Sequence, residues 1–158
     1  MRRVDFRAAC CTMGCRQFDE VQSPFSQVMT KPTTGPALAP EVVVAGPVTV
    51  IGLGPAFQII DEHVLDAGLG ESMIEIADEA NPPVVVLDLS HTRFFGSSFI
   101  EVLFRLWTRL QARAGGTFAI CGLTEHCLDV LKITHLDTLW RLFPDRDEAV
   151  RSLGTAGK

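Results

Sequence analysis

The sequence predicts an α/β fold, a mainly parallel sheet of four to five strands with helices packed against it. Short runs of β-branched and apolar residues alternate along the chain with stretches of helical periodicity, which is typical of this class. The run Val84–Leu89 has no polar alternation, as expected for a strand covered on both faces. With 158 residues, 47% of them hydrophobic, the chain can bury one sizeable core, and a second domain is not expected.

Two short strands and a helical stretch are predicted to open the domain. The strands are β-branched runs on either side of the turn residues Gly46-Pro47, namely Val42–Ala45 and Val48–Leu53. The residues between 59 and 80 follow a helical pattern that is broken near Gly68 and Gly70. The second part of this stretch separates apolar from acidic positions, as a helix lying on a core does. Its apolar positions are Leu69, Met73, Ile76 and Ala77.

A long amphipathic helix is predicted after the central strand, beginning close to a pair of serines. Glu101 precedes Arg105 by one turn, the favourable order for an exposed ion pair. Gly115 and Gly116 end the helix. The apolar residues that repeat at helical spacing are Phe99, Leu103, Leu106, Trp107 and Leu110.

The last third of the domain is predicted to add two strands and two helices. In chain order these are a strand at Thr117–Leu123, a helix at Glu125–Ile133, a strand near Leu139–Phe143 and a helix at Asp145–Leu153. Strands that alternate with helices imply right-handed crossovers and therefore a mainly parallel sheet.

The two ends of the chain differ from the domain, which we expect to span residues 41–154. Residues 1–40 are punctuated by four prolines and carry no sustained periodicity, so we expect a disordered or poorly ordered arm. Its phenylalanines, Phe6, Phe18 and Phe25, are available to dock on the domain. The start of translation is open between Met1 and Met29, and residues 155–158 form a short tail.

Charge and hydropathy restrict the partners of this protein. The net charge of −5 gives no broad basic field for nucleic acid, and Arg105, Arg109 and Arg113 are expected to form a solvated helix flank. No apolar run approaches the ~20 residues that span a bilayer as a helix, and charged residues interrupt any secretory signal near the N-terminus. We therefore expect a cytoplasmic protein that neither inserts into a membrane nor binds nucleic acid.

No motif for a metal, a cofactor or a catalytic nucleophile is complete. Five cysteines suit a reducing compartment, and the cluster Cys10, Cys11 and Cys15 lacks a fourth ligand at a zinc spacing. Gly52-Leu53-Gly54 does not continue into a dinucleotide fingerprint. The serine pair does not lie in a nucleophile elbow, so a hydrolase-like enzyme acylated at Ser97 or Ser98 is the weakest hypothesis. We expect no cofactor, no metal and no enzymatic activity.

The serine pair, Ser97-Ser98, permits two interpretations from spacing alone. Ser98 and Glu101 have the S-x-x-E form of a capping box, in which the hydroxyl and the carboxylate satisfy backbone donors at the helix start. Alternatively, the serines lie where unpaired N–H groups favour an anion such as phosphate. A phosphate on Ser98 would then lie near Glu101, which repels it. Spacing leaves both interpretations open.

The segment around the serines resembles the STAS domain of bacterial anti-sigma factor antagonists. In that family a parallel strand leads into a loop that reads roughly D-S-S-G and then into a helix; here the matching stretch is Phe94-Phe95-Gly96-Ser97-Ser98-Phe99-Ile100. The strand Thr117–Leu123, the helix Glu125–Ile133 and the order of residues around Thr134–Leu142 resemble the parts that follow in the family. The similarity covers about three quarters of the chain, from Glu41 to roughly Leu153.

The resemblance implies a non-enzymatic regulator with a phosphorylation switch. The family's acceptor, the second serine of the pair, falls on Ser98, with Ser97 as the alternative. A serine-protein kinase of the anti-sigma factor class phosphorylates it, which ends binding, and the resemblance also implies a PP2C-type phosphatase. The loop Ser90–Ser98 and the start of the next helix would form the partner surface. Its candidate residues are Phe94, Phe95, Gly96, Ser97, Ser98 and Phe99.

Two departures from the family pattern support an alternative function. Gly96 replaces the acidic residue before the serines, and Phe99 replaces the glycine after them. In the family the first strand usually ends in a turn that carries an aspartate near the acceptor serine. The matching stretch here, Gly54–Phe57, has no acid, and Asp61 and Glu62 come slightly later. The alternative is a STAS scaffold that is not phosphorylated and serves a signalling or transport assembly.

Overall fold

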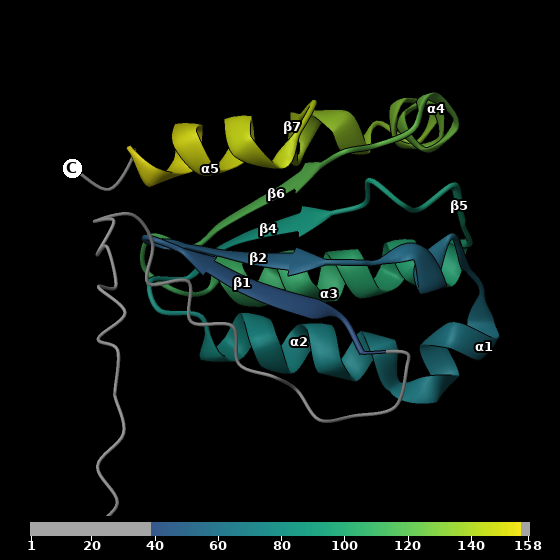
Figure 1. Cartoon of the computed structure of the whole chain (residues 1–158), viewed down its shortest axis with the longest axis horizontal. Helices are drawn as coiled ribbons and strands as arrows, with labels where there is room; N and C mark the ends of the chain where they lie inside the picture. The colour runs from purple at the N-terminus through teal and green to yellow at the C-terminus, as the bar shows by residue number, and fades with distance from the viewer. Residues whose placement is uncertain (1–38, 156–158) are drawn as a thin grey trace, which may run out of the picture.

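The computed structural model describes residues 39–155 and contains a five-stranded sheet with the strand order β1-β2-β4-β6-β7 (Figure 1). Strand β1 is antiparallel to β2, and the other neighbours are parallel. The predicted α/β class and the mainly parallel sheet are thereby confirmed. The strands are β1 Glu41–Ala45, β2 Val48–Gly52, β4 Val84–Asp88, β6 Thr117–Cys121 and β7 Arg141–Phe143.

Helices cover both faces of the sheet. Figure 1 shows α2 and α3 below the sheet and α5 above it. The helices are α1 Glu62–Val64, α2 Gly70–Glu79, α3 Ser97–Gln111, α4 Glu125–Ile133 and α5 Arg146–Gly154. Shorter helical turns lie at Pro55–Phe57, Leu65–Leu69 and Leu136–Thr138. Between residues 39 and 155 no helix has the length and apolar character needed to cross a bilayer.

Two apolar cores lie on opposite faces of the sheet. Alternate residues of each central strand enter different cores, because successive side chains of a strand point to opposite faces. On β4, for example, Val85 and Leu87 enter the larger core with α2 and α3, whereas Val86 enters the smaller one with Ala149 and Leu153 of α5. The central strand therefore reads as a continuous apolar run, and this prediction from the sequence is confirmed.

The stretch between Ile59 and Ala80 is only partly helical. Its first two residues form strand β3, Ile59–Ile60, which the helical pattern did not predict. The expected break occurs at Gly68, whose φ of 102° lies in the left-handed region that favours glycine. Helix α2 then starts at Gly70 and buries Met73 and Ala77 as predicted. The break separates α1 from α2.

Two of the three arginines on the flank of α3 contact α2. The prediction of a solvated face is wrong for Arg113, which is partly buried, whereas Arg109 is exposed as predicted. Arg109 forms an ion pair with Asp78. Arg113 donates hydrogen bonds to the carbonyls of Ala77, Asp78 and Ala80, at 3.0, 3.1 and 2.8 Å. These carbonyls lie at the C-terminal end of α2, where helix carbonyls lack partners within the helix. Arg113 thus caps α2 from a neighbouring helix.

We expect Arg113→Met to lower the free energy of unfolding by about 1–2 kcal/mol, because a charged donor to several carbonyls is lost while the aliphatic packing is kept. Urea unfolding followed by circular dichroism measures the change. Arg105, which is exposed on the same helix, supplies the control: Arg105→Met should change the free energy by less than about 0.5 kcal/mol. Equal losses in the two variants would contradict the capping role.

Candidate functional site

A loop at the C-terminal end of β4 leads to the serine pair, and a short parallel strand pairing fixes its path. Strand β5, Phe94–Phe95, pairs with β3 in the register Ile59↔Phe94 and Ile60↔Phe95. The backbone N–H groups of Arg93 and Phe94 donate to the Gln58 carbonyl at 2.8 and 3.1 Å. The N–H of Gly96 donates to the Ile60 carbonyl at 3.0 Å. These hydrogen bonds fix the position of the backbone immediately before α3.

Buried side chains anchor the same loop to the core. Thr92 is fully buried, and its hydroxyl donates to the carbonyl of Phe57 at 3.0 Å. Phe99 is fully buried and Phe95 is 5% exposed; their ring centroids lie 5.5 Å apart. Such a loop is rigid, since moving it would expose two aromatic rings and leave a buried hydroxyl without its partner.

The helix begins two residues earlier than a capping box of Ser98 and Glu101 requires. Gly96 is the N-cap residue, with extended backbone, so Ser97 and Ser98 are the first two residues of α3. No side chain caps this end. The capping-box interpretation of Ser98 and Glu101 is therefore wrong, and the reason is that the pairing of β5 with β3 continues to Gly96 and fixes the helix start there. The hydroxyl of Ser98 is consequently not used to satisfy the helix backbone.

The Ser98 hydroxyl instead lies beside a carboxylate from a distant part of the chain. Ser98 Oγ donates to Glu62 Oε1 at 3.4 Å. Glu62 is the first residue of α1, directly after Asp61, which caps that helix by accepting from the Val64 N–H at 3.1 Å. Glu62 is exposed and Ser98 partly exposed, while Ser97 is exposed. Neither serine is sealed in the interior.

Around the serines lies a small apolar surface. Phe94 is 47% exposed and Ile59, its partner in the strand pairing, is 58% exposed. The Phe94 ring stacks on the imidazole of His126 from α4, with centroids 6.2 Å apart. We call this region the serine-loop surface; it consists of Ile59, Glu62, Phe94, Ser97, Ser98 and His126.

The six residues predicted to contact a partner do not all reach this surface. Phe94, Ser97 and Ser98 do, and Gly96 is partly exposed beside them. Phe95 and Phe99 point into the core, where they support the loop and offer no surface to another protein. Because Phe99 is buried, its ring does not cover Ser98; Phe99 and Gly96 nevertheless remain departures from the family pattern.

A buried carboxylate fixes the start of the serine loop at the end of β4. Asp88 is 7% exposed. It accepts hydrogen bonds from the Ser90 N–H and hydroxyl and from Arg146 Nε, the last at 2.8 Å. Burial alone would raise the pKa of Asp88, but the bonds from Ser90 and Arg146 outweigh it and lower the pKa. The charged Asp88 thus ties the loop to α5.

Gly122 permits this arrangement because it adopts a φ of 69° and leaves room for Ser90. A Cβ at this position would overlap the Ser90 hydroxyl and lie 3.0 Å from Asp88 Oδ1. Only glycine combines this backbone conformation with the required space. Three segments, β4, β6 and α5, therefore meet at one polar contact beneath the loop.

The remaining reactive groups of the described residues do not form a site. Cys121 and Cys127 are buried. Burial, with the nearby negative charge of Asp88, raises the pKa of Cys121 to about 12, and burial raises that of Cys127, so both thiols stay protonated. From residue 39 to 155 no three His, Cys, Asp or Glu side chains are grouped to hold a metal ion. The cluster Cys10, Cys11 and Cys15 lies outside the described residues.

The chain belongs to the STAS domain family, whose model matches residues 60–149. It is also 33% identical to an anti-sigma-factor antagonist (STAS) domain protein from Planctomyces limnophilus, with a TM-score of 0.68 over 73% of this chain and 97% of the other. A comparison with curated proteins found no match.

More distant structures share the fold. An anti-sigma factor antagonist from Mycobacterium paratuberculosis is 23% identical, with a TM-score of 0.61 over 72% of this chain and 92% of that one. The unphosphorylated form of the anti-sigma factor antagonist SpoIIAA is 14% identical, with a TM-score of 0.53 over 75% and 99% of the two chains. The STAS-like fold predicted from the sequence is confirmed.

Three residues of the serine-loop surface were missed in the sequence. Glu62 was noted only as an acid that comes late after the first strand, and the structure places it against Ser98. Ile59 and His126 were assigned to helices without a role. The only available signal was Ile59-Ile60 directly before an N-capping Asp61, and a two-residue strand has too little pattern to be distinguished from a helix start.

We expect Asp88→Asn to reduce the dependence of stability on acid pH. Because the folded-state pKa of Asp88 is below its ordinary 3.8, the carboxylate stabilises the fold above pH 3.8, and this contribution is lost as the pH falls through the lower folded-state value. Urea unfolding between about pH 5 and pH 2.5 measures the slope. The exposed Asp129 gives the control, Asp129→Asn; the hypothesis fails if both variants keep the wild-type slope.

Proposed function

We propose that this protein is a non-enzymatic regulator that binds an anti-sigma factor with serine kinase activity through the serine-loop surface. In this proposal the kinase phosphorylates Ser98, with Ser97 as the alternative acceptor, binding then ends, and a PP2C-type phosphatase restores it. The interaction would take place in the cytoplasm and control transcription indirectly. The observation that carries the proposal is the position of Ser98, whose hydroxyl lies at the N-terminal end of α3, free of any capping role and beside Glu62.

The position of Ser98 suits a phosphate acceptor for two reasons. The hydroxyl is partly exposed at the rim of the domain, so a kinase reaches it without unfolding the loop. It also lies in the first turn of a 15-residue helix, where the backbone N–H groups and the helix dipole stabilise an added negative charge. Ser97 shares the helix end and is more exposed, but it has no hydrogen bond to Glu62.

Glu62 supplies the physical basis for a switch. The unmodified hydroxyl donates to the carboxylate, whereas a phosphoserine offers only acceptor oxygens and about 1.5 to 2 negative charges at neutral pH. Attraction between α1 and α3 at this point would then become repulsion. Since α1 is separated from α2 by the break at Gly68, α1 can move without displacing the buried face of α2.

The apolar part of the surface supports binding to a protein. Ile59 and Phe94 are neighbours on two short strands and are about half exposed. Exposed aromatic and aliphatic side chains beside a charged switch are typical of a protein interface. The rigid loop beneath them would limit the entropy lost on binding.

The first test uses recombinant serine-kinase anti-sigma factors from the source organism, with ATP and the full-length protein. We expect one phosphate per chain on Ser98 in phosphopeptide mass spectrometry, none on Ser98→Ala, and unchanged labelling of the matched variant Ser97→Ala. Phosphate on Ser97 would assign the switch to the alternative acceptor. Absence of phosphate from both serines would refute the switch and favour a STAS scaffold that is not phosphorylated.

The second test concerns Glu62. We expect phosphorylation to weaken binding of the wild type at least tenfold, equivalent to about 1.4 kcal/mol, in isothermal titration calorimetry. In Glu62→Gln the loss should be smaller by about fivefold, since like charges about 4 Å apart repel by about 1 kcal/mol in water. Glu71→Gln, an exposed carboxylate at the start of α2, should behave as wild type. The mechanism fails if Glu62→Gln also loses the full wild-type factor.

A further inference from the structure

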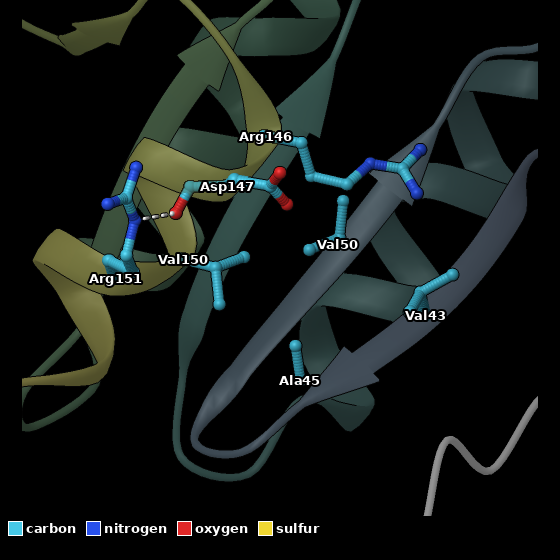
Figure 2. Close-up of a pocket in the computed structure, with 7 residues that line it drawn as sticks. All are labelled: Val43, Ala45, Val50, Arg146, Asp147, Val150 and Arg151. Atoms are coloured by element: carbon cyan, nitrogen blue, oxygen red, sulfur yellow. Dashed lines mark hydrogen bonds between the residues drawn. The ribbon is translucent and has the colours of Figure 1, made fainter. Parts of the chain in front are cut away.

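A groove of about 500 Å³ lies on the face of the sheet that α5 covers (Figure 2). Helix α5 packs against β2, β4, β6 and β7, whereas β1 lies at the edge of the sheet. The side chains of Val43 and Ala45 on β1 remain partly exposed. The lining residues are Val43, Ala45, Val50, Arg146, Asp147, Val150 and Arg151.

The chemistry of the groove favours an apolar occupant. Figure 2 shows the side chains of Val43 and Val50 on the sheet facing Val150 on α5. The two guanidinium groups at its rim already have partners: Arg146 Nε donates to Asp88 Oδ2 at 2.8 Å and Arg151 Nε to the Asp147 carbonyl at 3.3 Å. A ligand held by charge would have to compete with these contacts, whereas apolar side chains need only displace water from the valines and Ala45.

We propose that this groove is the docking site of the N-terminal segment of the same chain, residues 1–38. The chain passes from that segment through Ala39 and Pro40 directly into β1, the strand that forms one wall of the groove. Strand β1 spans only about 13 Å at 3.3 Å per residue, so a return of a few residues reaches the groove. The segment carries three phenylalanines, Phe6, Phe18 and Phe25, as apolar anchors.

Charge also favours this occupant. Residues 1–38 contain five Lys or Arg and three Asp or Glu, a net charge of +2, whereas residues 39–155 contain eight and sixteen, a net charge of −8. The segment and the domain therefore attract each other. A second copy of the domain would instead bring together two molecules of like net charge. The groove itself is lined by two arginines and one aspartate, so the charge argument concerns the long-range attraction between segment and domain.

The covalent connection gives the segment a further advantage over a second copy. A tethered segment is present near its site at an effective concentration of about millimolar, so weak apolar contacts suffice. The outer edge of β1 also supports docking of the segment, because among the described residues β1 pairs only with β2. The backbone groups of this edge that no residue between 39 and 155 pairs with are available to an extended segment, which would also protect the edge from pairing with other chains.

The test uses the full chain, whose segment carries natural thiols at Cys10, Cys11 and Cys15. Ala45→Cys adds a thiol in the groove, and the matched control Val44→Cys adds one at the next position of β1, which points to the opposite face. The two positions are nearly equally far from Ala39 along the sequence. A short bismaleimide cross-links the thiols, peptide mass spectrometry identifies the products, and N-ethylmaleimide rates correct for accessibility.

We expect cross-links within one chain from position 45 to the segment to form about tenfold faster than from position 44, as docking at millimolar effective concentration implies. Replacing Phe6, Phe18 and Phe25 together by Ser should abolish this preference. Equal corrected rates at the two positions would overturn the proposal, because an undocked segment reaches both alike. Cross-links that form mainly between chains would also overturn it and would assign the groove to a second copy.

Discussion

The pairing of β3 with β5 is the constraint on which the serine site depends. Each strand has only two residues, yet the pairing continues through the hydrogen bond from Gly96 to Ile60 and thereby fixes where α3 begins. If the helix started two residues later, Ser98 would be the N-cap residue and its hydroxyl would be used for capping. The same pairing brings the start of α1, and with it Glu62, beside the serine.

Burial enforces this pairing more strongly than its few hydrogen bonds do. Phe95 and Phe99 together place two aromatic rings in the core, and fully burying such side chains contributes about 1.5–3 kcal/mol each. Because Phe95 is inward, its neighbour Phe94 must point outward on so short a strand. The exposed aromatic ring of the serine-loop surface is therefore a geometric consequence of the buried one. Polar anchoring by Thr92 and Asp88 sets the remaining path of the loop.

The sequence allowed most of the fold to be predicted, since long elements carry enough pattern. Glu125–Ile133 was predicted with the bounds that α4 has, and the central strand was located to within one residue. The long helix was located correctly, although it ends at Gln111, before the glycines that were expected to end it. The pair β3 and β5 was not predicted because two residues have no periodicity. The long-range contact of Glu62 with Ser98 joins residues 36 positions apart, and the role of Arg113 depends on carbonyls more than 30 positions away. Local spacing contains no information on such contacts.

The capping box illustrates why a local motif is insufficient. Ser98 and Glu101 have the spacing that satisfies a helix end, and an isolated peptide of this sequence has no reason to avoid it. In the folded domain the hydrogen bond to Ile60 holds Gly96, two residues before Ser98, in an extended conformation. This long-range contact makes Gly96 the N-cap residue and overrides the local motif. The helix end is then left without a side-chain cap, a cost of about 1 kcal/mol. Leaving this end uncapped keeps the Ser98 hydroxyl beside Glu62 and next to helix N–H groups that no side chain caps, which is the arrangement on which the proposed phosphorylation depends.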